Sequence, residues 1–595
     1  MQWVGLGLFA ASLVVFTAML GLETYSLDAA DLPTAGNDYQ AEAIRAAAAE
    51  AGFAGREYGN VQGFIGGYGE VFADAQARLA ADFDANGAPE GLDEWGYKLG
   101  DGYLKNQLTP LVLAASRGPV SDHPWLFLAL TFGLAILGGV LYILPKFGDD
   151  PGIKHDHIYH SPLTRGLDVT WRGTLLAVTA LGVLGYGVTY MGDFMWPGVT
   201  ALVIGVIAAL VLFARRSIAR NPARSASPDA LSAPLGIFAG LYFIGFYVLL
   251  YWAAQYITPW VIMVNPVSEA LSGNPASQWF LYGLMYCAIV VVMGVRMWSK
   301  YQHNRYQLVR TGSVMFFQVG FAFLIPELLV RFNYPWYDFK NIWPLDYDFF
   351  FDWNLNQLLA SGTMGVFILG WGIALVLVAV PVITYFAGKR WYCSWVCGCG
   401  GLAETMGDPY RQLSDKSLRA WNFERYIIHG VLAFAIIMTA LVLWHFFTGE
   451  SAVAFLDANA VRQWYGFLIG AAFAGVVGTG FYPLMGNRVW CRFGCPLAAY
   501  LGLVQRFKSR FRITTNGGQC ISCGNCSTYC EMGIDVRWYA QRGQDIVRSS
   551  CVGCGVCSAV CPRGVLRLEN GGDTGAHRAD EQRVIHVGAS EVGML

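Results

Sequence analysis

The strongest constraint on this chain is a series of apolar runs, each long enough to cross a membrane. A helix needs about 20 mostly apolar residues to span the hydrocarbon layer, which is about 30 Å thick. Such runs recur about ten times and fill most of the chain before its C-terminal cysteines. They lie near residues 3–21, 125–144, 173–191, 196–213, 234–253, 279–298, 312–330, 362–386, 426–447 and 464–484. The sequence therefore predicts a polytopic α-helical membrane protein.

The charges of the loops predict the orientation of the spans. Lys and Arg gather in the connections after the second, fourth, sixth and eighth runs, whereas the alternate short loops hold only Arg331, Lys340 and Arg462. Positive loops stay on the cytoplasmic side, so we expect both termini to be cytoplasmic and the membrane to be the bacterial inner (cytoplasmic) membrane. The formal net charge of -2 gives no general attraction to nucleic acid, which we exclude as a partner.

Most of the cysteines follow the spacing of iron-sulfur ligands. Eight of them form two C-x2-C-x2-C-x3-C runs, made of Cys520, Cys523, Cys526 and Cys530, then Cys551, Cys554, Cys557 and Cys561. In bacterial ferredoxins with two [4Fe-4S] clusters, the fourth cysteine of each run serves the other cluster. We therefore expect one cluster on Cys520, Cys523, Cys526 and Cys561, and the second on Cys551, Cys554, Cys557 and Cys530.

Zinc is the alternative occupant of such thiols. Sets of four thiolates with two-residue gaps also bind zinc, but two complete runs of four favour iron-sulfur clusters. The expected cytoplasmic position argues against disulfides, because that compartment keeps thiols reduced. Glu531 stands where a proline might follow Cys530, and we expect it to affect only the local turn.

A second cysteine pattern is an internal repeat after the eighth and tenth runs. The segment from Lys389 to Gly398 and the segment from Asn487 to Pro496 each set two thiols four residues apart. On a helix this spacing places both sulfurs on one face. The two pairs, Cys393 with Cys397 and Cys491 with Cys495, are therefore candidates for a third iron or iron-sulfur centre. Redox-active thiol pairs and structural thiols are the alternatives, and Cys399 is a spare ligand.

These motifs resemble the membrane polyferredoxins, a group that includes NapH, NosR and CcoG. Paired C-x3-C-P motifs after transmembrane helices, followed by a two-cluster ferredoxin domain, carry the resemblance over about residues 360–566, with Gly398 in place of the first proline. The resemblance implies an inner-membrane protein that moves electrons between a quinol or a cytoplasmic donor and a partner redox complex. The chain has more spans than the short members and no recognisable flavin-attachment context.

The expected organisation has six segments. They are a membrane anchor helix at 1–21, an extracytoplasmic (periplasmic) helical segment at 22–123, a transmembrane helical body at 124–486, a membrane-edge cysteine motif with a connecting helix at 487–512, a small α+β dicluster ferredoxin domain at 513–568 and a flexible tail at 569–595. Ala-rich patterns at 40–52 and 68–83 predict helices in the second segment.

Several weaker signals have ordinary explanations beside functional ones. His155, His157 and His160 are candidate contacts for a metal or a quinone headgroup, although a solvated loop also accounts for them. Glu327 beside Pro326 is a candidate proton acceptor from a quinol, against simple placement at the membrane interface. His429 and His445 share one span about 24 Å apart, so they cannot hold one haem, and we do not expect haem.

The function that follows is electron transfer through two [4Fe-4S] clusters, with a quinone as a further candidate cofactor. One rival is an iron-sulfur reductase acting in metal-cofactor assembly, for example by reducing Cu(II). A second rival is a transporter whose ferredoxin domain senses redox state, which the small number of charges in the spans does not favour. Whether the chain is an enzyme or a subunit of one stays open.

Overall fold

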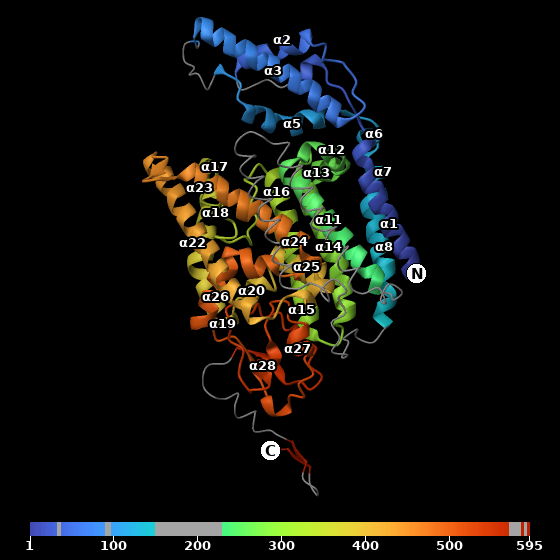
Figure 1. Cartoon of the computed structure of the whole chain (residues 1–595), viewed down its shortest axis with the longest axis vertical. Helices are drawn as coiled ribbons and strands as arrows, with labels where there is room; N and C mark the ends of the chain where they lie inside the picture. Colours follow the sequence, from blue (N-terminus) through green and yellow to red (C-terminus); the bar gives the residue numbers. More distant parts are fainter. Residues whose placement is uncertain are drawn as a thin grey trace. The chain divides into compact units, whose positions relative to one another are not determined.

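The computed structural model describes residues 1–32, 37–87, 89, 97–148, 229–570, 585–587 and 592–594. This part of the chain is mostly helical (Figure 1). It divides into two units: the described residues within 1–144 and 248–285 belong to the first, and those within 145–148, 229–247 and 286–594 belong to the second.

Seven helical stretches among the described residues are long and apolar enough to cross a membrane. They are Gln2–Gly21, Pro124–Phe147, Gln278–Lys300, Arg305–Arg331, Gly362–Ala387, Leu418–Thr448 and Ala458–Gly480. The run near 234–253 belongs to α11 (Asp229–Trp252), whose apolar part, Gly240–Trp252, is shorter. The runs near 173–191 and 196–213 lie outside the described residues. The polytopic helical class is confirmed, with the number of spans approximate.

The first unit contains a small helical layer with its own apolar core. Its helices and strands are α1 (Gln2–Ala18), β1 (Thr24–Tyr25), α2 (Asp38–Glu50), α3 (Val61–Asn86), α5 (Asp101–Ala115), β2 (Ser116–Arg117), α6 (Pro119–Asp122), α7 (Pro124–Leu128), α8 (Leu134–Ile143), α12 (Thr258–Met263) and α13 (Asn265–Leu271). Helices α2 and α3 cover the two Ala-rich stretches and bury Ile44, Phe64 and Tyr68 in that core.

Close packing of α1 against α8 depends on two glycines. A Cβ atom on Gly5 would lie 2.5 Å from the carbonyl oxygen of Gly138, and a Cβ on Gly138 would lie 2.6 Å from that of Gly5. Small residues allow two apolar helices to approach until their backbones touch, which is a common way for membrane helices to associate. The anchor helix is thereby paired with the second span.

The second unit is a helical bundle that leads into the cysteine-rich segments. Its helices are α15 (Arg305–Phe316), α16 (Ile325–Arg331), α17 (Asp352–Ala360), α18 (Gly362–Ala374), α19 (Val380–Ala387), α20 (Arg390–Cys393), α21 (Gly398–Thr405), α22 (Leu418–Thr448), α23 (Ala458–Tyr465), α24 (Gly478–Gly480), α25 (Tyr482–Met485) and α26 (Pro496–Lys508), with the strand pair β3 (Ala452–Val453) and β4 (Leu456–Asp457). Helix α14 (Gln278–Lys300) ends in this unit.

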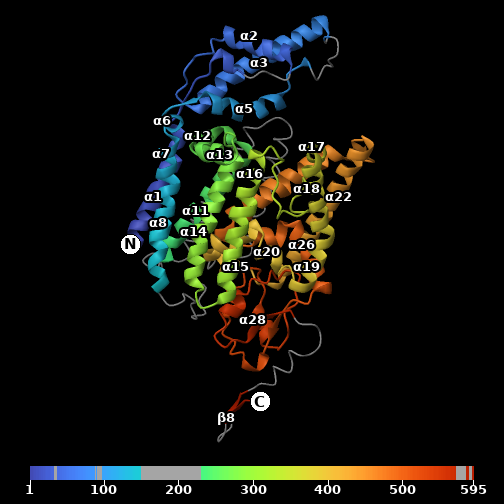
Figure 2. The ribbon, with the colours of Figure 1, turned by 180° about the vertical axis from the view of Figure 1, so that it is seen from behind.

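The C-terminal part of the second unit is a small α+β region. Strand β5 (Arg512–Thr515) pairs antiparallel with β6 (Leu566–Glu569), and between them lie α27 (Asn525–Thr528), α28 (Val536–Ala540) and α29 (Val556–Ala559). In the two opposite views, α28 lies past the ends of α15 and α19 (Figures 1 and 2). In the tail, β7 (Ile585–Val587) and β8 (Val592–Met594) pair antiparallel.

Candidate metal centres

The first of two thiol-lined cavities lies beside α27. Its cysteines are Cys520, Cys523, Cys526 and Cys561. Gly524, which adopts a left-handed conformation with φ 80°, ends the loop and starts α27. That turn brings Cys526 back toward the two preceding thiols. Cys561 arrives from the other cysteine run, after α29.

The second cavity contains the complementary set of thiols. Its cysteines are Cys530, Cys551, Cys554 and Cys557. The fourth cysteine of each run therefore lines the cavity of the other run. We refer to these spaces as cavity one, with Cys561, and cavity two, with Cys530.

The chemistry of cavity two fits a bound metal cluster. Burial raises the pKa of Cys551 to about 11 and that of Cys554 to about 12. The thiolate forms therefore require a compensating cation, and thiolates are the ligands that iron-sulfur clusters take. The backbone beside the cavity is held by Tyr306, whose hydroxyl donates to the carbonyl of Gly553 at 3.0 Å, and by Gln307, which donates to that of Cys554 at 2.8 Å.

The two cysteine pairs that follow apolar helices are arranged differently from our expectation. Cys393 ends α20, whereas Cys397 has extended backbone angles and caps the start of α21. In the second repeat, Cys491 lies in the π-helical turn Trp490–Gly494, and Cys495 caps the start of α26. The prediction that each pair occupies one face of a continuous helix is wrong, because the helix breaks between the two thiols.

Both repeats make the same turn. The amide of Cys397 donates to the carbonyl of Tyr392 at 2.7 Å, and the amide of Cys495 donates to that of Trp490 at 2.9 Å. Each bond spans five residues, so each turn folds the second thiol back beside the first. The internal similarity of the two sequences thus corresponds to a repeated local structure.

These four thiols lie together, and we call them the thiol quartet: Cys393, Cys397, Cys491 and Cys495. Burial raises the pKa of Cys495 well above its usual range, and the other three thiols raise it further. A hydrogen bond from Cys399 lowers the pKa of Cys397 to about 6, so Cys399 lies at the edge of the quartet as a hydrogen-bond donor. Four buried, mutually repelling thiols suit a soft metal or an iron-sulfur cluster.

A buried ion network connects the quartet with cavity two. Arg488 donates to the Sγ of Cys491 at 3.5 Å and also pairs with Glu404 at 2.6 Å and Glu531 at 3.0 Å. Arg411 pairs with the second oxygen of Glu531 at 2.8 Å. Further members are Arg310, which pairs with Glu404, and Asp408, which pairs with Arg411, Lys300 and Arg296. Buried charges persist only where they are paired in this way.

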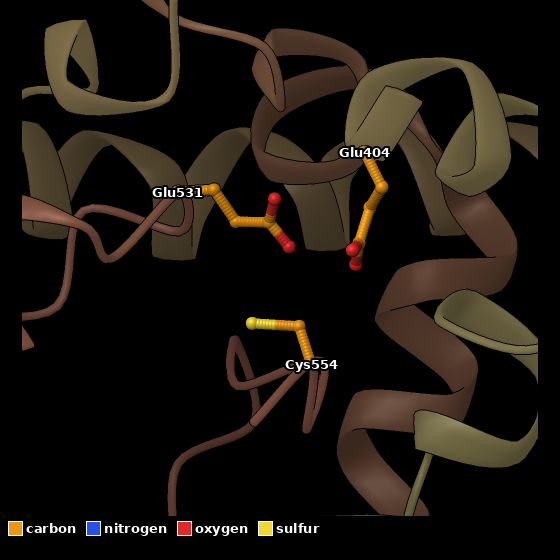
Figure 3. A group of neighbouring side chains, drawn as sticks. All are labelled: Glu404, Glu531 and Cys554. Atoms are coloured by element: carbon orange, nitrogen blue, oxygen red, sulfur yellow. The ribbon is translucent and has the colours of Figure 1, made fainter. Parts of the chain in front are cut away.

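Glu404 and Glu531 also point toward Cys554, which lines cavity two. Their carboxylate oxygens and the Sγ of Cys554 all lie within 4.8 Å of one another (Figure 3). A metal ion could be coordinated by such a trio. Here the two carboxylates are already bound by guanidinium groups, so we interpret the trio as the point where the ion network meets cavity two.

Sequence reasoning missed this network. Our expectation that Glu531 affects only a local turn is wrong, because its side chain is fully buried and pairs with Arg411 and Arg488. One signal was available: both repeats carry basic residues just before the first thiol, Lys389 in one and Arg488 in the other. Both of these side chains are buried.

The weaker candidates that the structure describes make other contacts. Glu327 in α16 accepts a hydrogen bond from the indole of Trp336 at 3.2 Å, as a carboxylate at a membrane interface would. The rings of His429 and His445 in α22 hydrogen-bond to the carbonyls of Arg425 and Glu450. His155, His157 and His160 lie outside the described residues.

Two family models match the cysteine-rich segments. A 4Fe-4S dicluster domain matches residues 505–566, and a 4Fe-4S binding domain matches twice, at residues 369–417 and 465–514. The double match covers the two repeats that supply the quartet. These matches show that the chain contains 4Fe-4S binding segments beside apolar helices that are long enough to cross a membrane, an arrangement similar to that of the membrane polyferredoxins.

The curated relatives are named as electron transport or ferredoxin-type proteins. The chain is 29% identical over 170 residues to the putative electron transport protein YccM of Escherichia coli (strain K12), covering 27% of this chain and 46% of that protein. It is 28% identical over 180 residues to the methylamine utilization ferredoxin-type protein MauN of Methylobacillus flagellatus, covering 29% and 58%. The chain thus spans about half the length of these curated relatives. No solved structure matches it.

Proposed function

We propose that the chain relays electrons through two [4Fe-4S] clusters, one in each cavity. Cys520, Cys523, Cys526 and Cys561 would hold the first cluster, and Cys530, Cys551, Cys554 and Cys557 the second. A [4Fe-4S] cluster takes up and gives up one electron without breaking a bond in a substrate. The observation that carries the proposal is that each cavity is lined by four thiols drawn from both runs.

The thiol quartet would hold a third iron or iron-sulfur centre. Its segment contacts cavity two directly, since the hydroxyl of Ser394 donates to the carbonyl of Val552 at 2.7 Å. Arg488 forms a second link, through Glu531 on one side and Cys491 on the other. This arrangement supports an order in which cavity two lies between cavity one and the membrane edge.

The loop charges support a cytoplasmic location for all three sites. Clusters on one side cannot by themselves bridge about 30 Å of hydrocarbon. The electron would therefore pass between a cytoplasmic donor and a quinone or a cofactor of a partner redox complex at the membrane edge. The protein acts, in this proposal, as an electron-transfer subunit in the inner membrane.

Metal counting tests the proposal. The full-length protein, purified without oxygen, should contain about twelve iron and twelve sulfide per chain if the quartet holds a [4Fe-4S] cluster, or about eight if only the two cavities are filled. Stepwise reduction monitored by EPR should resolve three paramagnetic centres if the quartet holds a cluster, and two if only the cavities are filled. Zinc without sulfide would contradict the proposal.

A further inference from the structure

The C-terminal region from 505 to 570 has an unusual surface charge. It contains nine Lys or Arg and four Asp or Glu, a net charge of +5, whereas the whole chain has a formal charge of -2. None of the four carboxylates is exposed: Glu531 is buried, and Asp535, Asp545 and Glu569 are partly buried. The exposed charged residues are all basic, namely Arg506, Lys508, Arg510, Arg537, Arg542, Arg563 and Arg567.

Part of this basic surface surrounds cavity one. Arg537 and Arg563 line the cavity itself. Ile521, between the first two cluster thiols, is 58% exposed, and Trp538 is 41% exposed. Arg542 lies over the ring of Trp538 at 3.9 Å. We call these five residues the cavity-one face.

The charges of this face are free to meet a partner. Within the described part of the chain, Arg537, Arg542 and Arg563 form no ion pair. An apolar centre with a charged rim is typical of surfaces at which proteins meet. A rim of one charge sign speeds the approach of a partner of the opposite sign.

The position of the face argues against membrane lipid as its occupant. Arg537 and Trp538 belong to α28, which both views place past the ends of α15 and α19 (Figures 1 and 2). The basic residues at the end of α26 are different, because the amide of Arg510 donates to the carbonyl of Tyr385 in α19 at 2.7 Å. Those residues lie at the end of a span, where anionic headgroups would meet them.

We propose that a soluble acidic electron-carrier protein, of the ferredoxin or flavodoxin class, docks on the cavity-one face and delivers electrons there. One electron leaves the reduced carrier and enters the centre in cavity one; the carrier is oxidised, and no bond forms or breaks. The proposal rests on the relay described above. It adds the class of donor and the point at which the electron enters.

Stopped-flow reduction of the full-length protein in neutral lipid nanodiscs tests this docking. The probes are a reduced acidic ferredoxin and a reduced flavodoxin. We expect the second-order rate to fall about tenfold or more when salt rises from about 0.03 to 0.3 M. At low salt, the double variant Arg537→Glu with Arg563→Glu should have a second-order rate about tenfold or more below that of the wild type. The matched double variant Arg506→Glu with Lys508→Glu should stay within about threefold of the wild type.

Iron content and EPR spectra distinguish failure of the docking proposal from failure of the electron relay. If both double variants retain their clusters and are reduced equally fast, the docking proposal is wrong while the relay stands. If the wild type contains no iron-sulfur cluster, the relay itself is wrong. If the face binds lipid instead, wild-type reduction will be slow in phosphatidylglycerol discs and the Arg537/Arg563 double variant will be fast in both kinds of disc.

Discussion

The guanidinium group of Arg488 donates to the sulfur of Cys491 at 3.5 Å while its second terminal nitrogen pairs with Glu404 at 2.6 Å. The same side chain donates to the carbonyl of Cys393 at 3.3 Å and is fully buried. Arg488 thus contacts both halves of the thiol quartet and holds a carboxylate that borders cavity two. A positive charge at this point would stabilise electrons on the third centre proposed for the quartet.

Replacing Arg488 should therefore change the redox behaviour of that centre. In Arg488→Met the N–H···S bond and the positive charge are lost, so we expect its reduction potential to fall, by tens of millivolts. EPR-monitored redox titration measures this shift. Arg492→Met is the matched control, because Arg492 lies beside the same motif but pairs with Glu424 at 3.0 Å. Equal shifts in both variants would contradict a specific role for Arg488.

Iron content should distinguish the thiols of the quartet, which we expect to be ligands, from the neighbouring Cys399. Cys393→Ala should remove the third centre and lower the iron content from about twelve to about eight per chain. Cys399→Ala removes a hydrogen bond to Cys397 but no ligand, so its iron content should stay unchanged. Iron and sulfide analysis of the two purified variants decides between these outcomes. An unchanged total in Cys393→Ala would leave the quartet as structural or redox-active thiols.

The exchanged fourth cysteines make a prediction about spectra. Cys530→Ser should alter the same EPR signal as Cys557→Ser, because both residues line cavity two. Cys523→Ser should alter the other signal, together with Cys561→Ser, because both line cavity one. If variants of the same cysteine run altered the same EPR signal, whichever cavity they line, each run would bind its own cluster.

Asp408 gives a prediction about stability and pH. Burial alone would raise its pKa, but Lys300, Arg411 and Arg296 outweigh burial and lower the pKa below 3.8. A carboxylate with a lowered pKa stabilises the fold fully above its unfolded value, and the contribution disappears only as the pH falls through the folded value. Asp408→Asn should therefore cost about 3–5 kcal/mol, and the loss should be constant from about pH 8 to about pH 5.

Thermal unfolding of the two proteins across that range provides the measurement. The matched control is Asp352→Asn, which removes the partly exposed pair of Asp352 with Arg462 at 2.6 Å. We expect a much smaller cost there, about 1 kcal/mol or less. A wild-type advantage that grows as the pH falls from 7 to 5 would mean that the pKa of Asp408 is raised in the folded protein and not lowered.

The sequence allowed the helices and the cysteine groups to be predicted because their signals are local. Apolar length marks a span, and the spacing of Cys520 to Cys530 is complete within eleven residues. The ion network is not local, since Arg310, Glu404 and Glu531 are brought together only by the fold. Loop counting used the basic residues only to orient the spans, and it carried no information on the burial of Arg310, Glu404 and Glu531 that the structure shows.

The break within each cysteine pair had a local signal that we read incompletely. Pro496 follows Cys495 directly, and proline favours the first position of a new helix over the interior of an existing one. The structure places Pro496 at the start of α26. The proline therefore indicates that Cys495 caps a helix, and the spacing of the thiols alone could not show this.

The repeated turn has a consequence for how the quartet is assembled. Each repeat contributes two thiols, so a protein with a single copy would need a second chain to complete a four-ligand set. Here both copies occur in one chain, about a hundred residues apart. The ligand set therefore has a fixed stoichiometry and a high effective concentration, and dilution of the protein in its membrane cannot separate one half from the other.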